Sequence, residues 1–243
     1  MNLPEISANH VLGLATSMNT FGWGILSDYL APADLKGLAN FIERAVEGNG
    51  GQYVAFSGRE PVAGTLLEEL GRSPQLTKLL AGLYQAGLER PAPRQGLYQL
   101  LRCLKGQSGL RQSLRFHYDS YVVTALLPII IPAEGAAGHL IMLPNTRPVR
   151  SNYLFNLLDK IILDNPLTQW FLRLGYLNFL PFKLVEMVPG NLYLFWGYRS
   201  IHANRPCDPD QIRATALFHF GDPHTGNSLR KITGRAKARA ASL

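Results

Sequence analysis

The sequence predicts a mainly β protein with helices, in which short strands form a barrel or jelly-roll core. From Tyr98 onward, short strand-like runs alternate with turns that contain glycine. Before Tyr98, and again over about residues 152–180, apolar residues recur with the period of a helix. Helices packed around about six short strands, with strands on both sides of a helical insert, favour a β core with a helical jacket.

The first 97 residues are expected to be mainly helical support for this core. Residues 33–47 and 74–89 carry apolar residues at helical spacing, and Asp34 is the expected N-cap of the first helix. Residues 52–57 are expected to form a strand between them.

The core itself is expected over residues 98–222, interrupted by the helical insert. Within the insert, Leu154, Leu158 and Ile162 recur at intervals of four, which predicts an amphipathic helix. We expect this apolar, aromatic segment to lie in the core or at a dimer face. The predicted strands are residues 98–104, 114–132, 139–143, 184–188, 192–196 and 212–220.

Composition indicates one globular domain of 243 residues, with 47% hydrophobic and 17% charged residues. The two cysteines argue against a disulfide framework, and neither a signal peptide nor a membrane span is evident. We therefore expect a soluble cytoplasmic protein.

The net charge of +7 is unevenly distributed along the chain. Five cations fall in residues 230–243, which are expected to be a mobile tail, and without them the net charge is +2. This near-neutral body argues against nucleic acid or a membrane as partner and favours a small-molecule substrate, with a homodimer possible.

The stretch RFHYDSYVVTALLPIIIP, residues 115–132, places His117 and Asp119 at the head of an apolar run. Side chains at i and i+2 of a strand point to the same side, so these two can reach one metal ion. His202 follows a later strand, and a barrel can bring it to the same ion. Two imidazoles and one carboxylate on one face of Fe(II) form the facial triad of non-haem oxygenases.

These residues, in their order, resemble the Fe(II)- and 2-oxoglutarate-dependent dioxygenases, closest in spacing to the phytanoyl-CoA hydroxylase-like branch. The resemblance covers about residues 98–222 and implies a double-stranded β-helix, that is, a jelly-roll or cupin-like core. It implies that Fe(II) is held by the triad and that 2-oxoglutarate and O2 are co-substrates. The set that carries it is His117-x-Asp119, Pro189-Gly190, the strand at residues 192–195, His202, and Arg213 eleven positions later.

The resemblance also implies roles on the co-substrate side. Arg213 would hold the C5 carboxylate of 2-oxoglutarate through its guanidinium, and Thr215, on the same face of the strand, would add a hydroxyl. Asn204 either touches the co-substrate or caps a loop. Related halogenases carry Gly or Ala at the position of Asp119, so its presence favours hydroxylation or a related oxidation of a C–H bond, with release of succinate and CO2.

Two departures from the family pattern concern the substrate side. Gly190-Asn191 stands where Gly-Asp is usual, and Pro144-Asn145-Thr146-Arg147 stands where Pro-Gly-Ser-His is usual.

Three alternative functions stay open. One is a zinc hydrolase, although HxH and HExxH motifs are absent, and another is an AlkB-like nucleic-acid demethylase, although its Arg-x-Asn-x-Thr-x-Arg signature is absent. The third is a non-catalytic cupin-like binding or scaffold protein.

The substrate pocket is predicted from strand parity. Tyr121 and Val123 continue the parity of His117 and Asp119 and should line the barrel, with Tyr193 and His219 as further candidates. None of these residues identifies the substrate beyond a small metabolite.

Overall fold

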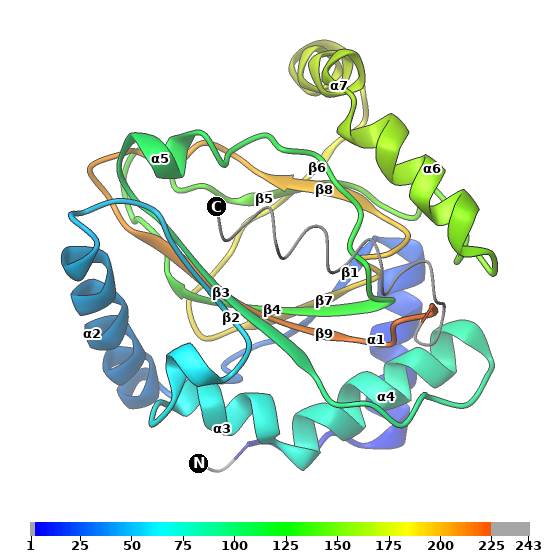
Figure 1. Ribbon diagram of the computed structural model, residues 1–243. Helices are drawn as coiled ribbons and strands as arrows, with labels where there is room; N and C mark the ends of the chain where they lie inside the picture. The colour runs from blue at the N-terminus through cyan, green and yellow to red at the C-terminus, as the bar shows by residue number, and fades with distance from the viewer. Residues whose placement is uncertain (1–2, 225–243) are drawn as a thin grey trace.

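The computed structural model describes residues 3–224, so the basic segment 230–243 lies outside the described residues. Its core consists of two antiparallel sheets that face each other (Figure 1), which confirms the predicted jelly-roll core with added helices. The strands are β1 (Trp23–Leu26), β2 (Val54–Ser57), β3 (Tyr98–Leu104), β4 (Val123–Ile130), β5 (Leu140–Leu143), β6 (Lys183–Val185), β7 (Leu192–Phe195), β8 (Ile201–Asn204) and β9 (Arg213–Phe220).

The larger sheet has the order β1-β7-β4-β9-β3-β2, and the smaller sheet has the order β6-β5-β8. The first 97 residues contribute β1 and β2 to the two edges of the larger sheet, through antiparallel pairing with β7 and β3. They are therefore more than helical support.

Helices cover the outer face of the larger sheet, and a separate pair projects beside the smaller one (Figure 1). The main hydrophobic core lies between α1–α4 and the outward-facing residues of β4, β7 and β9. The helices are α1 (Ala8–Thr20), α2 (Pro32–Gly48), a 3-10 turn at Glu60–Val62, α3 (Leu66–Arg72), α4 (Pro74–Leu88), α5 (Gly106–Leu110), α6 (Tyr153–Asp164) and α7 (Pro166–Asn178). Within residues 3–224, no helix is both long and apolar enough to cross a bilayer.

The regular periodic segments were predicted well. Strand 98–104 has its predicted bounds, and helices 33–47 and 74–89 match α2 and α4 to within one residue. Asp34 was wrong as an N-cap, because Pro32 at the first helical position makes Ala31 the cap and leaves Asp34 in the first turn. Helices α1, α3 and α5 and strands β1 and β8 were not predicted from the sequence.

The predicted long strand over residues 114–132 was also wrong. Residues 120–122 form a bend, and the regular strand begins only at Val123. This bend resets the alternation of side chains, so Val123 packs in the core under the helices while Thr124 faces the space between the sheets, opposite His219. Tyr193 does face that interior, and its hydroxyl bonds to the backbone of residues 186 and 188.

Candidate metal centre

His117, Asp119 and His202 meet at the rim between the two sheets. The backbones of His117 and His202 exchange two hydrogen bonds of 3.1 Å, and the Asp119 N–H donates to the carbonyl of Gly197 at 2.9 Å. These bonds place the Asp119 Oδ1 atom 3.8 Å from His117 Nε2 and 3.6 Å from His202 Nε2. All three donor atoms lie within 4.8 Å of one another, close enough to share one metal ion.

Both imidazoles are oriented by backbone carbonyls. His117 Nδ1 contacts the carbonyl of Arg115 at 2.9 Å, and His202 Nδ1 contacts the carbonyl of Ser200 at 3.0 Å. A carbonyl can only accept, so each Nδ1 carries a hydrogen and each Nε2 is the ring nitrogen that faces Asp119. This outer hydrogen bond is the usual support of a metal-ligating histidine.

The carboxylate is fixed through its other oxygen. Asp119 Oδ2 accepts from the Thr124 hydroxyl at 2.5 Å and lies 3.7 Å from His219 Nδ1, which leaves Oδ1 for the shared position. Gly197 makes room for this arrangement, because a Cβ there would lie 2.2 Å from Asp119 Oδ2. Thr124 and Gly197 were not found from the sequence, since their contacts with Asp119 depend on tertiary structure.

The charges suit a divalent cation. Burial alone would raise the pKa of Asp119, but the neighbouring His202 and His219 hold it well below its usual range. Burial lowers the pKa of His117, and His202 lowers it further. Burial would lower the pKa of His202 too, but Asp119 raises it. An ionised carboxylate beside a neutral imidazole is the state that metal binding requires, and a metal ion would displace the proton from His202.

Arg213 is a buried cation without an anionic partner. Its side chain is 4% exposed, and it donates to the Thr215 hydroxyl at 3.2 Å and to the Met187 sulfur at 3.7 Å. Its Nε has no hydrogen-bond partner, and it forms no ion pair with any residue from 3 to 224. Burial, and secondarily the charge of Arg102, lower its pKa to about 9.

Arg102, which was not found from the sequence, is a second cation of the barrel interior. It lies directly opposite Thr215 in the pairing of β3 with β9, and cross-strand partners point to the same face. Its Nε donates to the Tyr53 hydroxyl at 3.2 Å. Its charge lowers the pKa of Arg213 and contributes at His117 as well, so it lies near both ends of the candidate site.

Asn204, the last residue of β8, bonds to a distant segment and to its own neighbour. Its amide donates to the Ser113 hydroxyl at 3.3 Å and to the carbonyl of Arg205 at 2.9 Å. Whether Asn204 also touches the co-substrate stays a prediction.

A cavity of about 310 Å³ opens beside His117 and Asp119. One wall is aromatic: the Tyr121 ring stacks on Tyr98 at 5.5 Å and on His219 at 5.4 Å between centroids. Tyr121 and His219 thus lie where the sequence predicted, whereas Val123 does not. Further lining residues are His117, Asp119, Arg115 and Lys160, the last from α6.

The chain is similar to known proteins in its three-dimensional structure. Neither a protein-family model nor a curated protein sequence matches the chain. A prolyl-4-hydroxylase from Pseudomonas putida has a TM-score of 0.56 at 13% identity, over 87% of this chain and 98% of the other. The epimerase SnoN in complex with Fe3+, alpha ketoglutarate and nogalamycin RO has a TM-score of 0.56 at 14% identity, over 88% and 85%. Iron-bound HygX from Streptomyces hygroscopicus has a TM-score of 0.56 at 11% identity, over 90% and 87%.

These neighbours do not confirm the phytanoyl-CoA hydroxylase-like branch. At such low identity the likeness establishes the fold, over most of the chain and most of each neighbour. The chain therefore has the fold of iron- and 2-oxoglutarate-dependent oxygenases.

Proposed function

We propose that this chain is an Fe(II)- and 2-oxoglutarate-dependent oxygenase that hydroxylates, or otherwise oxidises, an unactivated C–H bond of a small metabolite. The observation that carries the proposal is the buried, unpaired Arg213 guanidinium on the barrel face that leads to the triad. Burying a charge without a partner costs on the order of several kcal/mol of folding free energy. We therefore expect an anionic ligand to pair with the Arg213 guanidinium. A dicarboxylate bound at Arg213 with its far end at the triad meets this requirement.

The roles of the residues follow from their contacts. His117, Asp119 and His202 would hold Fe(II), with both imidazoles oriented by carbonyls and the carboxylate held by Thr124. Arg213 would bind the C5 carboxylate of 2-oxoglutarate bidentately, with Thr215 beside it. When bound, iron and 2-oxoglutarate supply the activation of dioxygen and the oxidation of the C–H bond, with succinate and CO2 as co-products.

The cavity supports a small substrate. Its volume of about 310 Å³ lies at the lower end of ligand pockets, and its aromatic wall provides an apolar surface for a bound molecule. The neighbours include a prolyl-4-hydroxylase and an enzyme of nogalamycin biosynthesis, so this fold serves different substrates. Membership of the phytanoyl-CoA hydroxylase-like branch stays a prediction.

The test is the visible charge-transfer band that forms when 2-oxoglutarate chelates protein-bound Fe(II) without oxygen. We expect this band in the unchanged protein, its loss in His202→Ala, and its appearance only at raised 2-oxoglutarate in Arg213→Met. Arg72→Met serves as a matched control, because Arg72 is an exposed arginine on α3 paired with Glu68. A protein that binds Fe(II) but gives neither the band nor succinate would instead be a cupin-like binding or scaffold protein.

A further inference from the structure

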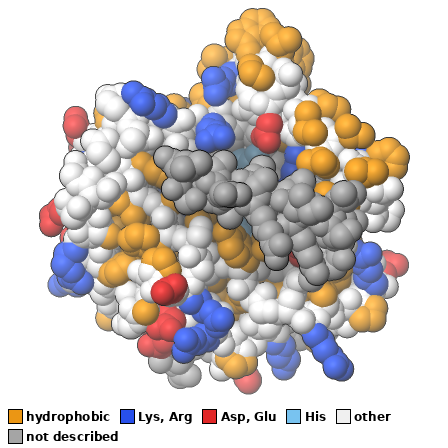
Figure 2. Space-filling view, viewed as in Figure 1, with side chains coloured by type: hydrophobic (Ala, Val, Ile, Leu, Met, Phe, Trp, Pro, Cys, Tyr) orange, Lys and Arg blue, Asp and Glu red, His pale blue; other side chains and the backbone are white. Residues whose placement is uncertain are grey.

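The pair of helices α6 and α7 is apolar on the side that faces solvent. Of the eighteen large hydrophobic side chains exposed among the described residues, eleven lie between residues 154 and 179, with exposed fractions from 39% to 77%. Figure 2 shows them gathered over the projecting helices. We call this set the outer face: Leu154, Phe155, Leu158, Ile161 and Ile162 of α6, Leu167, Trp170, Phe171, Leu174 and Leu177 of α7, and Phe179 after it.

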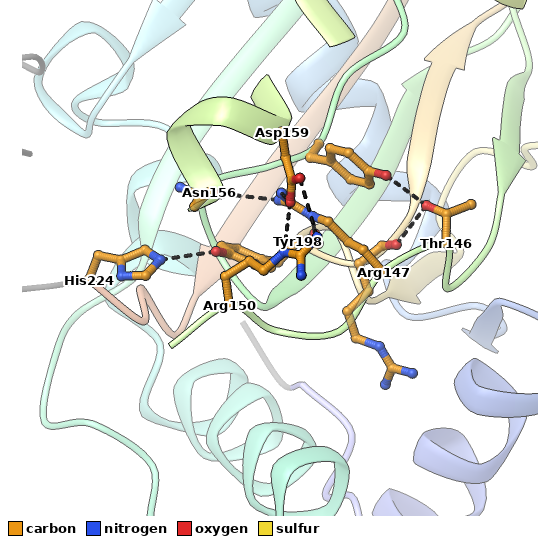
Figure 3. A network of polar contacts seen from close by, with 9 residues as sticks. Thr146, Arg147, Arg150, Asn156, Asp159, Tyr198 and His224 are labelled. Atoms are coloured by element: carbon orange, nitrogen blue, oxygen red, sulfur yellow. Dashed lines mark hydrogen bonds and ion pairs between the residues drawn. The ribbon is translucent and has the colours of Figure 1, made fainter. Parts of the chain in front are cut away.

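The polar side of α6 points the other way, into the body of the protein. Asp159 accepts from Arg147 and from Arg150, each at 2.8 Å, and Asn156 accepts from Arg147 at 3.2 Å (Figure 3). The buried Arg147 guanidinium also lies 3.8 Å from the ring centroid of Tyr118. The helix cannot roll to bury its apolar side without breaking these bonds.

Polar contacts on its inner side also anchor helix α7. Gln169 bonds to both the N–H and the carbonyl of Phe116, at 3.1 and 2.7 Å, and Arg173 donates to the carbonyl of Leu114 at 3.2 Å. The outer faces of both helices are therefore held toward solvent by polar contacts on their inner sides. Burying an apolar face is the usual reason for an amphipathic helix to dock, and here that face is left without a partner within the described chain.

We propose that the outer face is a self-association surface on which a second copy of this chain packs its own α6 and α7. Leu167, Trp170, Leu174 and Leu177 follow the three-four-three spacing by which helices interdigitate along a seam. Leu154, Leu158 and Ile161 on α6 show the same kind of spacing. In a pair of copies related by a two-fold axis, each copy can cover the apolar stripes that the other exposes when alone.

The size of the outer face also fits a dimer. Apolar patches on monomeric proteins reach about 300–600 Å². Eleven large side chains, each about half exposed, present on the order of 1,000 Å², which exceeds the roughly 800 Å² per partner of a standard interface.

The test is the oligomeric state of the full chain, measured by sedimentation velocity over a micromolar concentration range. We expect a dimer for the unchanged protein and a monomer for the double variant Leu158→Glu, Leu174→Glu, with the same far-UV circular dichroism. Leu12→Glu is the matched control, because Leu12 is equally apolar and exposed but lies on α1. We expect this variant to remain a dimer.

The emission of Trp170, taken as the difference between the unchanged protein and Trp170→Phe, should shift to longer wavelength as dilution dissociates the dimer. An unchanged protein that stays monomeric throughout, or a double variant that stays dimeric, overturns the proposal. If that monomer co-sediments with phosphatidylserine-containing vesicles and the double variant does not, the outer face binds membranes instead. None of these measurements depends on the proposed oxygenase activity.

Discussion

Two arginines of the barrel interior differ in how each side chain is held. Arg213 is buried, with one hydroxyl and one sulfur as its acceptors and an unpaired Nε. Arg102 is half-buried and already bonded to the Tyr53 hydroxyl. An incoming carboxylate therefore gains more from Arg213 than from Arg102.

We expect Arg213→Met to raise the 2-oxoglutarate concentration for half-maximal succinate formation by about tenfold to a hundredfold. The reason is the loss of a charge-assisted hydrogen bond worth about 1.5–3 kcal/mol. Arg102→Met should raise it by less, and the Fe(II) requirement should stay the same in both. Succinate production at saturating Fe(II) measures the effect. An unchanged 2-oxoglutarate dependence in Arg213→Met would mean that another cation binds the co-substrate.

A polar cluster around Arg147 anchors helix α6. Arg147, on the loop before α6, joins Asp159 and Asn156 of the helix to the backbone carbonyl of Tyr198. Burial alone would raise the pKa of Asp159, but its hydrogen bonds with Arg150 and Arg147 lower it. A carboxylate whose pKa is lowered by folding stabilises the folded state above its unfolded-state pKa, and this stabilisation is lost as the pH falls through the lower, folded value.

We expect Asp159→Asn to lower the free energy of unfolding by about 1–3 kcal/mol at neutral pH, because it removes a charge from hydrogen bonds with two arginines. The difference from the unchanged protein should shrink below about pH 4, near the unfolded-state pKa of an aspartate. Urea unfolding at neutral and acid pH measures both effects. Glu68→Gln, in an exposed pair with Arg72, should cost no more than about 1 kcal/mol. A constant difference at all pH values would show that the ionised carboxylate is not what holds α6.

For the whole molecule, the candidate metal centre joins its two sheets. His202 belongs to β8 of the smaller sheet, and Asp119 is held by Thr124 of β4 in the larger sheet. An ion bound to both would oppose their separation, because it binds the folded chain and not the unfolded one.

We expect Fe(II), added without oxygen at about 100 times its Kd, to stabilise the protein by about 2.7 kcal/mol. For a chain of this size that raises the Tm by about 5–10 °C, and a chelator should reverse the gain. Thermal unfolding followed by circular dichroism measures the shift. His202→Ala should abolish it, whereas His10→Ala, which removes an exposed histidine on α1, should keep it. An equal shift in both variants would place the ion elsewhere.

The class of fold and the order of the site residues could be predicted from the amino-acid sequence alone. Strand 98–104 and helices α2 and α4 follow from periodicity, a local property that burial on one face imposes. The donor types at His117, Asp119 and His202 were readable because few side chains can ligate a metal, and the structure brings these three together.

The directions in which the side chains face depend on tertiary contacts and could not be predicted. The bend at residues 120–122 turned Val123 into the core and Thr124 toward Asp119, and the register of β3 against β9 placed Arg102 beside Thr215. The spacing of apolar residues predicted that α6 has an apolar face. It did not predict whether that face points to the core or to solvent. Arg147 lies outside the helix and binds Asp159 on its polar side, so the apolar face of α6 points to solvent. The orientation of a helix depends on such partners, which the local sequence pattern does not contain.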